Sequence, residues 1–305
     1  MKRLSGLAAL LLMAVLYVTP NPAQAGSYEV RDCMPFTTGA LGAFSSTPAN
    51  GFEFENACGG NVDYYGYDIY LKPNPAYNQG DIGRVKFHAP SGIGITGIDA
   101  WVYTNLINDT QWSPKVVMHD AGANGVAVSL PYSGLGQISY DLPSGQARQD
   151  VEANLKCTTT TCVGRPTNTG FMDIGSVSLT VRDSTKPVAV SNQGTLYAGG
   201  VVSGSRTVEV LGTDGESGTW RIILMVNGQL VGYQDNVGSA PGVSCDPSTG
   251  STTSFRPCYF GITHTWTVNT ASAPFKNGAN SVFACATDYS GESKCTDATT
   301  VYVSN

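Results

Sequence analysis

Charged residues and histidines are scarce in this sequence. Only 13% of the 305 residues are Asp, Glu, Lys or Arg, and the three histidines are His88, His119 and His264. The chain has no G-x-S-x-G motif, which in hydrolases exposes a nucleophilic serine, and no H-E-x-x-H motif or EF-hand loop. These absences argue against the common hydrolase and metal-site signatures. We therefore expect no cofactor and no catalytic residue.

Basic residues are outnumbered as well as few. The chain has 17 Lys and Arg against 23 Asp and Glu, which gives a formal net charge of −6. Proteins that bind nucleic acids or anionic membrane surfaces carry basic patches. We therefore expect that this protein does not bind nucleic acid.

Residues 1–25 have the pattern of a secretory signal peptide. Lys2 and Arg3 precede an apolar run over residues 7–18 that is too short to span a bilayer comfortably, and Ala23-Gln24-Ala25 forms a small-x-small cleavage site. We expect cleavage after Ala25. The mature protein should then be secreted to the extracellular space without a membrane span.

All eight cysteines follow this segment. An even number of cysteines in an exported chain predicts disulfides, because thiols oxidise outside the cell. The simplest scheme joins sequence neighbours, and a hairpin around residues 289–291 would place the last two cysteines opposite each other. The predicted disulfides are Cys33–Cys58, Cys157–Cys162, Cys245–Cys258 and Cys285–Cys295.

The residue pattern predicts an all-β fold of two antiparallel β-sandwich domains. Segments with alternating apolar residues recur between Gly, Pro, Asn and Asp clusters, and only residues 147–155 could form a helical turn or two. About eight strands before residue 183 suit a jelly-roll-like or concanavalin-like sandwich, and six or seven later strands suit an immunoglobulin-like sandwich. Asn227-Gly228 between two apolar runs predicts a hairpin. The DSTKP segment indicates a linker, so we place the domains at 26–183 and 188–305, with the linker at 184–187.

Two turns in the second half of the chain resemble each other. Residues 213–218 (TDGESG) and 287–292 (TDYSGE) both end a predicted strand with Thr-Asp and then turn on Ser-Gly. One hypothesis is a calcium site at one pole of the sandwich, and the other is that each Asp caps its own turn. A hard cation needs six or more oxygen ligands, and no dense Asp/Asn loop is present. We therefore favour turn capping and expect no metal.

The segment GANSVFACATDYSG, residues 278–291, resembles the strand pair of bacterial immunoglobulin-like domains. TVEVLGTDGESG and LMVNGQLV are similar to the central strands of the same domains. FHAPSGIGITG, the CTTTTC stretch and the strand that runs into RDSTKP resemble an N-terminal jelly-roll-like sandwich found before such domains in exported bacterial proteins. The resemblance covers most of residues 27–305. It implies a two-domain β fold and does not imply an activity.

The stretch CTTTTC, residues 157–162, allows three interpretations. A zinc site would need two further ligands at suitable spacing, and a redox pair would need two intervening residues that open a helix. Neither condition is met, because no such ligands are present and four β-branched threonines resist helix formation. We therefore predict a disulfide that clasps a long loop without a core beneath it.

Glu53-Phe54-Glu55 places two carboxylates on one face of a predicted strand. Their separation is about 7 Å by strand rise, which is compatible with the acid and base of a glycoside hydrolase. Laminarinase-type sandwich enzymes carry E-x-D-x-x-E, whereas here the central Asp is replaced by Glu55 and the third carboxylate by Cys58. We therefore favour a solvated polar face at this strand.

Aromatic residues are the strongest indication of a ligand. Residues 61–80 contain five tyrosines among Asn, Asp and Gly, and sugar rings offer apolar faces and hydroxyl edges to such a surface. The alternative is that the tyrosines pack a strand face and hydrogen-bond through their hydroxyl groups. A strand end before a Gly-rich loop, as in VVMHDAGANG, is also where sandwich sites form. The predicted ligand-binding residues are Tyr64, Tyr65, Tyr67, Trp112, His119 and Asp120.

These observations favour an exported, non-enzymatic protein that binds a carbohydrate or a cell surface through its first domain. A structural or adhesive surface protein without a small ligand is the alternative. A glycoside hydrolase or lyase comes third.

Overall fold

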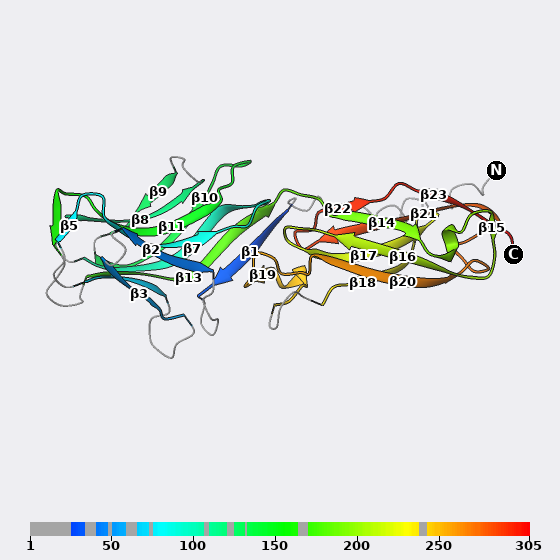
Figure 1. Ribbon diagram of the computed structural model, residues 1–305, viewed down its shortest axis with the longest axis horizontal. Helices are drawn as coiled ribbons and strands as arrows, with labels where there is room; N and C mark the ends of the chain where they lie inside the picture. Colours follow the sequence, from blue (N-terminus) through cyan, green and yellow to red (C-terminus); the bar gives the residue numbers. More distant parts are fainter. Residues whose placement is uncertain are drawn as a thin grey trace, which may run out of the picture.

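The computed structural model describes residues 26–33, 41–47, 51–58, 66–72, 76–106, 110–120, 125–131, 133–163, 170–237 and 243–305. Over these residues the chain is all-β, as predicted, and forms several sheets with predominantly antiparallel pairing. The strands form two lobes that lie end to end, with the C-terminus at the far tip of the second lobe (Figure 1). No helix among the described residues is long and apolar enough to cross a membrane.

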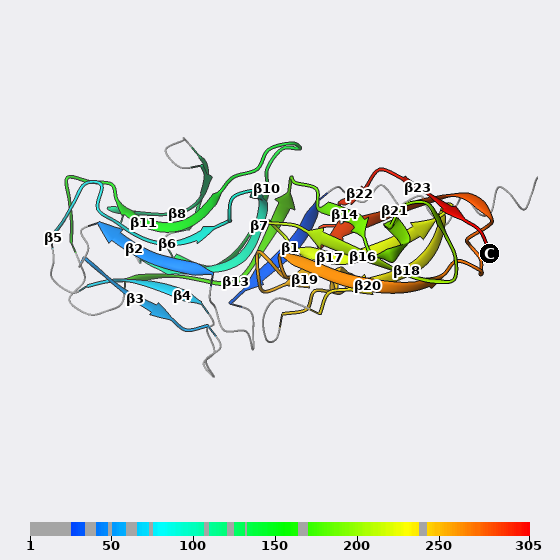
Figure 2. The same ribbon diagram turned by 45° about the vertical axis from the view of Figure 1, so that its right-hand side comes forward.

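Two layered sheets build the first lobe (Figure 2). Sheet A has the order β10-β7-β13-β1, with β4 on the first part of β13, β3 on β4, and the short β19 on β1. Sheet B has the order β2-β6-β11-β8-β9, and β5 pairs with β12 at the edge. The bounds in sheet A are β1 Ser27–Asp32, β3 Phe52–Asn56, β4 Tyr67–Leu71, β7 Ile93–Asn105, β10 Ser133–Asp141, β13 Phe171–Asp183 and β19 Ser251–Thr252. The remaining bounds are β2 Gly42–Thr47, β5 Ala76–Asn78, β6 Ile82–His88, β8 Trp112–His119, β9 Val126–Ser129, β11 Asp150–Cys157 and β12 Thr161–Val163.

Alternation along each strand creates the core between the two sheets. In β6 and β8 every second residue is buried, so that Val85, Phe87, Val116 and Met118 face sheet A. Successive side chains of a strand point to opposite faces, which explains why this pattern predicted the strands correctly. Each fully buried side chain of this size stabilises the fold by about 1.5–3 kcal/mol.

The stretch that could have formed a helical turn is the central strand of sheet B. Residues 150–157 form β11, which pairs with β6 on one side and β8 on the other. Val151 and Leu155 are fully buried, whereas Glu152 on the opposite face pairs with Arg84 at 3.1 Å. Two flanking strands therefore override the weak local preference for a helix.

The second lobe contains two further sheets. One has the order β14-β16-β20 and the other β15-β23-β21-β17-β18, with β22 paired to β21. Asn227 and Gly228 form the turn between β17 and β18 with φ of 51° and 77°, which confirms the predicted hairpin. The bounds are β14 Val188–Gln193, β15 Val201–Val202, β16 Ser205–Thr213, β17 Thr219–Val226, β18 Gln229–Asp235, β20 Gly261–Asn269, β21 Gly278–Asp288, β22 Ser293–Cys295 and β23 Thr299–Val303.

All four predicted disulfides are present. Cys285 and Cys295 are register partners in the β21–β22 hairpin, as expected. The interpretation of CTTTTC needs one correction, because Cys157 and Cys162 are fully buried in a small apolar cluster with Tyr77 and Trp112. This disulfide therefore lies over a core, which sequence spacing could not show.

The two lobes share an extensive junction. The chain passes from β13 to β14 through residues 184–187, where the linker was predicted, and the division into two independent domains stays a prediction. β19 lies in the second half of the sequence yet pairs with β1. Phe255 and Tyr289 also pack into the core of the first lobe. Loops from the second half of the chain thus complete the first lobe.

Candidate functional site

The structure places two of the predicted ligand-binding residues in the core. Tyr67 is fully buried, and its hydroxyl group donates a hydrogen bond to the Asp32 carboxylate at 2.6 Å. Trp112 is also fully buried, edge to face with Tyr77 at 4.9 Å between ring centroids. Neither ring can stack on a ligand at the surface, so both are removed from the candidate site. Tyr64 and Tyr65 lie outside the described residues.

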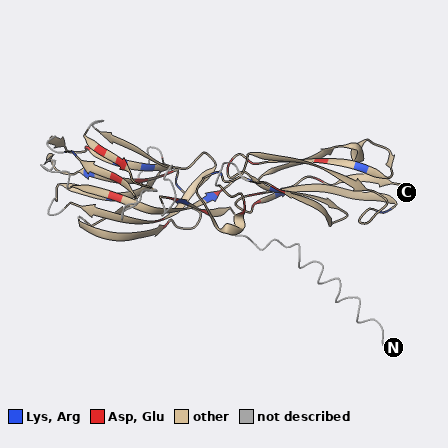
Figure 3. Cartoon of the chain, turned by 90° about the horizontal axis from the view of Figure 1, so that it is seen from below, with Lys and Arg blue, Asp and Glu red and all other residues tan. Residues whose placement is uncertain are grey.

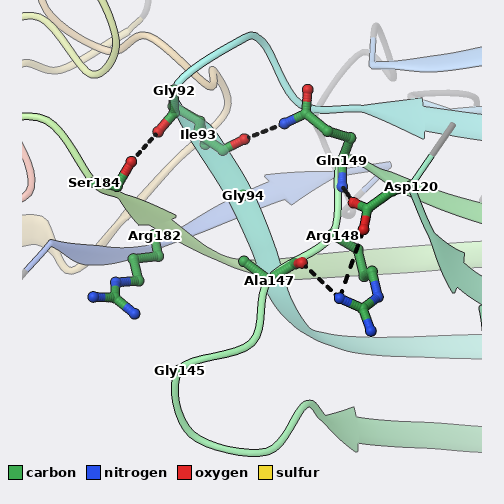
Figure 4. Close-up of a pocket in the computed structure, with 10 residues that line it drawn as sticks. All are labelled: Gly92, Ile93, Gly94, Asp120, Gly145, Ala147, Arg148, Gln149, Arg182 and Ser184. Carbon is green, nitrogen blue, oxygen red and sulfur yellow. Dashed lines mark hydrogen bonds and ion pairs between the residues drawn. The ribbon is translucent and has the colours of Figure 1, made fainter.

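His119 is the last residue of β8, and Asp120, which follows it, lines a pocket of about 400 Å³ (Figure 4). Asp120 accepts a hydrogen bond from the Gln149 backbone N–H at 3.0 Å, and its other oxygen lies 3.6 Å from Arg148 Nη1. His119 Nε2 lies 3.6 Å from the Glu152 carboxylate, and no serine of the described chain hydrogen-bonds to this histidine. These contacts tie the end of β8 to the segment before β11, which is a structural role.

A different surface gathers aromatic and acidic side chains on the outer face of sheet A. Charged residues are sparse over both lobes (Figure 3), so a concentration of carboxylates stands out. The strands β3, β4, β13 and β7 lie next to one another there, and their alternation directs one set of side chains away from the core. We call this surface the acidic–aromatic face, and it consists of Glu53, Glu55, Asp68, Tyr70, Tyr103, Phe171 and Asp173.

Strand register aligns these side chains in two rows. Glu55 is opposite Asp68, and Asp68 is opposite Asp173, so three carboxylates lie side by side on three neighbouring strands. Tyr103 continues this row on β7, because it is the register partner of Asp173. Directly opposed side chains in an antiparallel pair have Cβ atoms about 4.5–5.5 Å apart. The four groups therefore form one continuous polar row.

The second row is largely aromatic. Phe171 is the register partner of Tyr70, and 5.6 Å separates the centroids of the two rings. The Tyr103 ring of the polar row lies 5.3 Å from the Phe171 ring. All three rings are partly exposed. Such a cluster offers flat apolar surface beside carboxylate and hydroxyl groups.

Burial and mutual repulsion shift the ionisation of the carboxylates in the polar row. Asp173 is 7% exposed, and its burial together with the negative charge of Asp68 raises the pKa of this carboxyl to about 7. Burial also raises the pKa of Asp68 to about 6, an effect that the Tyr70 hydroxyl partly offsets. At neutral pH the row therefore carries both ionised and protonated carboxyl groups, which can accept and donate hydrogen bonds.

The buried carboxyl of Asp173 is only partly satisfied. Within the described ranges its Oδ1 atom has no hydrogen-bond partner, and a side chain at Gly66 would overlap the same carboxyl. An unsatisfied buried acceptor costs the fold free energy, so such a group is often kept for a function.

Two hollows lie on the outer face of sheet A. One of about 410 Å³ is lined by Glu53, Glu55 and Tyr70, with Phe54. The other, of about 340 Å³, is lined by Trp101, Gln137 and residues of β1 and β13. Trp101 is 46% exposed, which is unusual for so large an apolar side chain. The two hollows together extend from β3 to β10, which is four strand spacings or about 19 Å.

Sequence reasoning located only part of this face. Glu53 and Glu55 were considered as a pair, and Tyr70 lies in the tyrosine-rich segment, but their partners Asp173 and Phe171 come from a strand about 100 residues later. One signal could have indicated Asp173. It is the single charged residue in the otherwise uncharged run over residues 171–181, where an isolated acid is unexpected.

Comparison with known proteins identifies no family. No family model matches the chain, and no curated protein matches it. Among solved structures, it is similar to the K1 cleaved adhesin domain of Lys-gingipain from Porphyromonas gingivalis W83, with 12% identity, a TM-score of 0.30, and coverage of 50% of this chain and 96% of that one.

Two further similarities are to carbohydrate-related proteins. For the family 11 carbohydrate-binding module from Clostridium thermocellum in complex with a mixed-linked tetrasaccharide, the identity is 10%, the TM-score 0.27 and the coverage 51% of this chain and 95% of that chain. For a β-1,2-glucanase from Parabacteroides distasonis, the identity is 11% and the TM-score 0.31, and the match covers 92% of this chain and 39% of that chain. Similarity this low does not indicate which ligand the present chain takes.

Proposed function

We propose that this protein is secreted, is not an enzyme, and binds a carbohydrate on the acidic–aromatic face. The observation that carries the proposal is the cluster of the Tyr70, Phe171 and Tyr103 rings, with two hollows on the same face of sheet A. Sugar rings stack their apolar C–H faces on aromatic rings, and their hydroxyl groups hydrogen-bond to carboxylates and amides. The four disulfides agree with an extracellular location, because such bonds persist in oxidising compartments.

The charge of the face indicates the kind of carbohydrate. Glu53 and Glu55 are exposed, and the ion pairs of the described residues do not involve either of them. Uronic or sulfated sugars would bring a second negative charge to this surface and would be repelled. The expected ligand is therefore a neutral polysaccharide or one with amino sugars.

Glycan-array binding and polysaccharide pull-down test the proposal. The wild-type protein should be retained on neutral or amino-sugar glycans and not on sulfated ones. Tyr70→Ala and Trp101→Ala should each weaken binding about tenfold, which corresponds to about 1.4 kcal/mol. Tyr302→Ala is the matched control, since Tyr302 is 55% exposed on β23 of the second lobe.

Two results would contradict this function. Retention on no glycan would favour the alternative of a structural or adhesive surface protein. Equal binding by the wild type, Tyr70→Ala and Trp101→Ala would place the carbohydrate elsewhere on the molecule.

A hydrolase is the second candidate, and one observation favours it. Asp68 and Asp173 are opposed carboxyl groups whose pKa values are about 6 and about 7, so one can be protonated while the other is ionised. Glycoside hydrolases use such a pair as acid and base or nucleophile. Release of product from a bound glycan by the wild type, together with loss of that release in Asp173→Asn, would support this candidate over simple binding.

A further inference from the structure

Three aspartates from separate strands meet at the junction of the two lobes. Asp183 is the last residue of β13 in the first lobe, whereas Asp214 follows β16 and Asp288 ends β21 in the second lobe. Their side chains are 1%, 3% and 0% exposed. One carboxylate oxygen from each lies within 4.8 Å of one from each of the others. We call this group the junction triad.

The junction triad has no ion-pair partner in the described part of the chain. Buried carboxylates are ordinarily paired with a cation or neutralised, because leaving them charged and unpaired costs several kcal/mol. Three such groups in one buried place therefore require a compensating charge.

Hydrogen bonds occupy one oxygen of each second-lobe aspartate. Asp214 Oδ2 accepts from the Gly218 N–H at 2.6 Å, and Asp288 Oδ1 accepts from the Ser290 hydroxyl at 2.6 Å and the Glu292 N–H at 2.9 Å. The capping predicted for the two similar turns is therefore present. The other oxygens, Asp214 Oδ1 and Asp288 Oδ2, are buried and have no hydrogen-bond partner among the residues that the structure describes.

Asp183 joins the second lobe directly. Its Oδ2 accepts a hydrogen bond from the Ser217 N–H at 3.1 Å, and its Oδ1 accepts from Thr185 in the linker at 2.9 Å. The junction triad thus spans the two lobes. Backbone N–H groups of neighbouring turns hold each of its members in place.

Electrostatics supports the need for a cation. Burial and repulsion from the other two carboxylates raise the pKa of Asp288 to about 8. Burial and the charge of Asp183 raise the pKa of Asp214 to about 6. In the absence of a cation, protons would have to take its place.

We propose that the junction triad binds one calcium ion, which joins the two lobes. Calcium takes six to eight oxygen ligands in flexible geometry, including carboxylates, backbone carbonyls and waters, whereas magnesium demands near-ideal octahedral geometry and keeps more of its water. Carboxylates that already carry hydrogen bonds from fixed turns suit the flexible ion. Calcium sites in extracellular modules commonly bind with a Kd of about 10⁻⁴–10⁻³ M.

Terbium luminescence and thermal unfolding test this site in the full mature protein. Tyr289 follows Asp288, and the Tyr28 ring lies 5.2 Å from the Tyr289 ring, so excited tyrosine should sensitise a terbium ion bound there. Calcium should compete with the terbium signal at a stoichiometry of one. Calcium at 10 mM should raise the Tm by about 5 °C over the protein in EDTA.

Single substitutions assign the effect to the junction triad. Asp214→Asn and Asp288→Asn should each abolish the calcium-dependent rise in Tm and weaken terbium binding at least tenfold. In EDTA both variants should be at least as stable as the wild type, because each replaces a carboxyl group that is costly to bury without a cation. Asp297→Asn is the control, since Asp297 is exposed and its substitution should leave the calcium response unchanged.

The wild-type titration decides the proposal even if a variant fails to fold. A Tm that is equal in calcium and EDTA, together with no sensitised terbium signal, would overturn it. A calcium response that persists in both Asp214→Asn and Asp288→Asn would overturn it as well, because the ion would then lie elsewhere.

Discussion

At the residue scale, buried carboxyl groups distinguish this protein from an ordinary β-sandwich. Asp173 and Asp68 belong to the acidic–aromatic face, and the junction triad lies between the lobes. Fully buried aspartates are rare unless they are paired or hydrogen-bonded. Each therefore marks a place where the fold tolerates a cost in stability, and both places coincide with a proposed binding site.

Asp173 makes the stability depend on pH. The pKa of this carboxyl is about 7 in the folded protein and near 3.8 when it is exposed, so the unfolded chain loses its proton first as pH rises. The stabilisation that this carboxyl adds to the free energy of unfolding is fully present below pH 3.8, falls as pH rises to about 7, and is then constant. The loss is on the order of 2–4 kcal/mol.

Asp173→Asn should remove this pH dependence. We expect the variant to gain stability relative to the wild type as pH rises from 4 to 8, measured as the free energy of unfolding in urea. Asp297→Asn provides the comparison at an exposed site. A difference between Asp173→Asn and wild type that stays constant from pH 4 to pH 8 would contradict the raised pKa.

At the element scale, alternation predicted most strands, but the central strand β11 was interpreted as a possible helical turn. β6, β8 and β16 alternate between buried and more exposed residues, because one face of each meets a core. The sequence of β11, DVEANLKC, also alternates polar and apolar residues, although nearly every residue of the strand is buried. Its identity as a strand is imposed by pairing on both sides.

The disulfide Cys157–Cys162 should stabilise the protein more than its short loop suggests. Closing a loop of five residues contributes about 2 kcal/mol by chain entropy. Both sulfur atoms also pack against Tyr77 and Trp112, and truncating such buried groups leaves a cavity. The double variant Cys157→Ala with Cys162→Ala should therefore lose about 3–4 kcal/mol in denaturant unfolding.

The loss can be separated into its two parts. A double variant with serine at both positions has nearly the same volume as the reduced pair, so it should fill the cavity. It should also bury two hydroxyl groups in the apolar core, which is unfavourable. If the alanine variant loses only about 2 kcal/mol, the disulfide acts by loop closure alone and the packing argument is wrong.

At the scale of the whole molecule, the two lobes are coupled through the residues of their junction. Tyr28 donates a hydrogen bond to the Phe255 carbonyl and packs edge to face on Tyr289. β1 also pairs with β19 across the junction. These contacts belong to the core of the first lobe, so opening the junction would expose that core.

The lobes should therefore unfold in one transition. Differential scanning calorimetry of the wild type should give a calorimetric enthalpy close to the van't Hoff enthalpy. Tyr28→Ala should lower the Tm by about 5–10 °C and separate the transition into two, because it removes a buried ring at the junction. Tyr302→Ala serves as the exposed control, and two transitions in the wild type would show that the lobes are independent.

Much of the architecture followed from the amino-acid sequence alone. Alternation predicted the all-β class, Asn227-Gly228 predicted a turn, and cysteine spacing predicted four disulfides. These features are local, since each depends on residues that are close in the chain. The same local reasoning identified the two Thr-Asp turns and their caps.

Tertiary structure alone decided which residues meet. Tyr67 and Trp112 had the composition of a binding surface, yet their strand faces turn them into the core. Strand pairing brings Asp173 beside Asp68, and the junction of the lobes brings Asp183 near Asp288, each over about 100 residues of chain. The physical reason is that alternation says which residues share a face, but not which strands become neighbours. That choice depends on how the whole core packs.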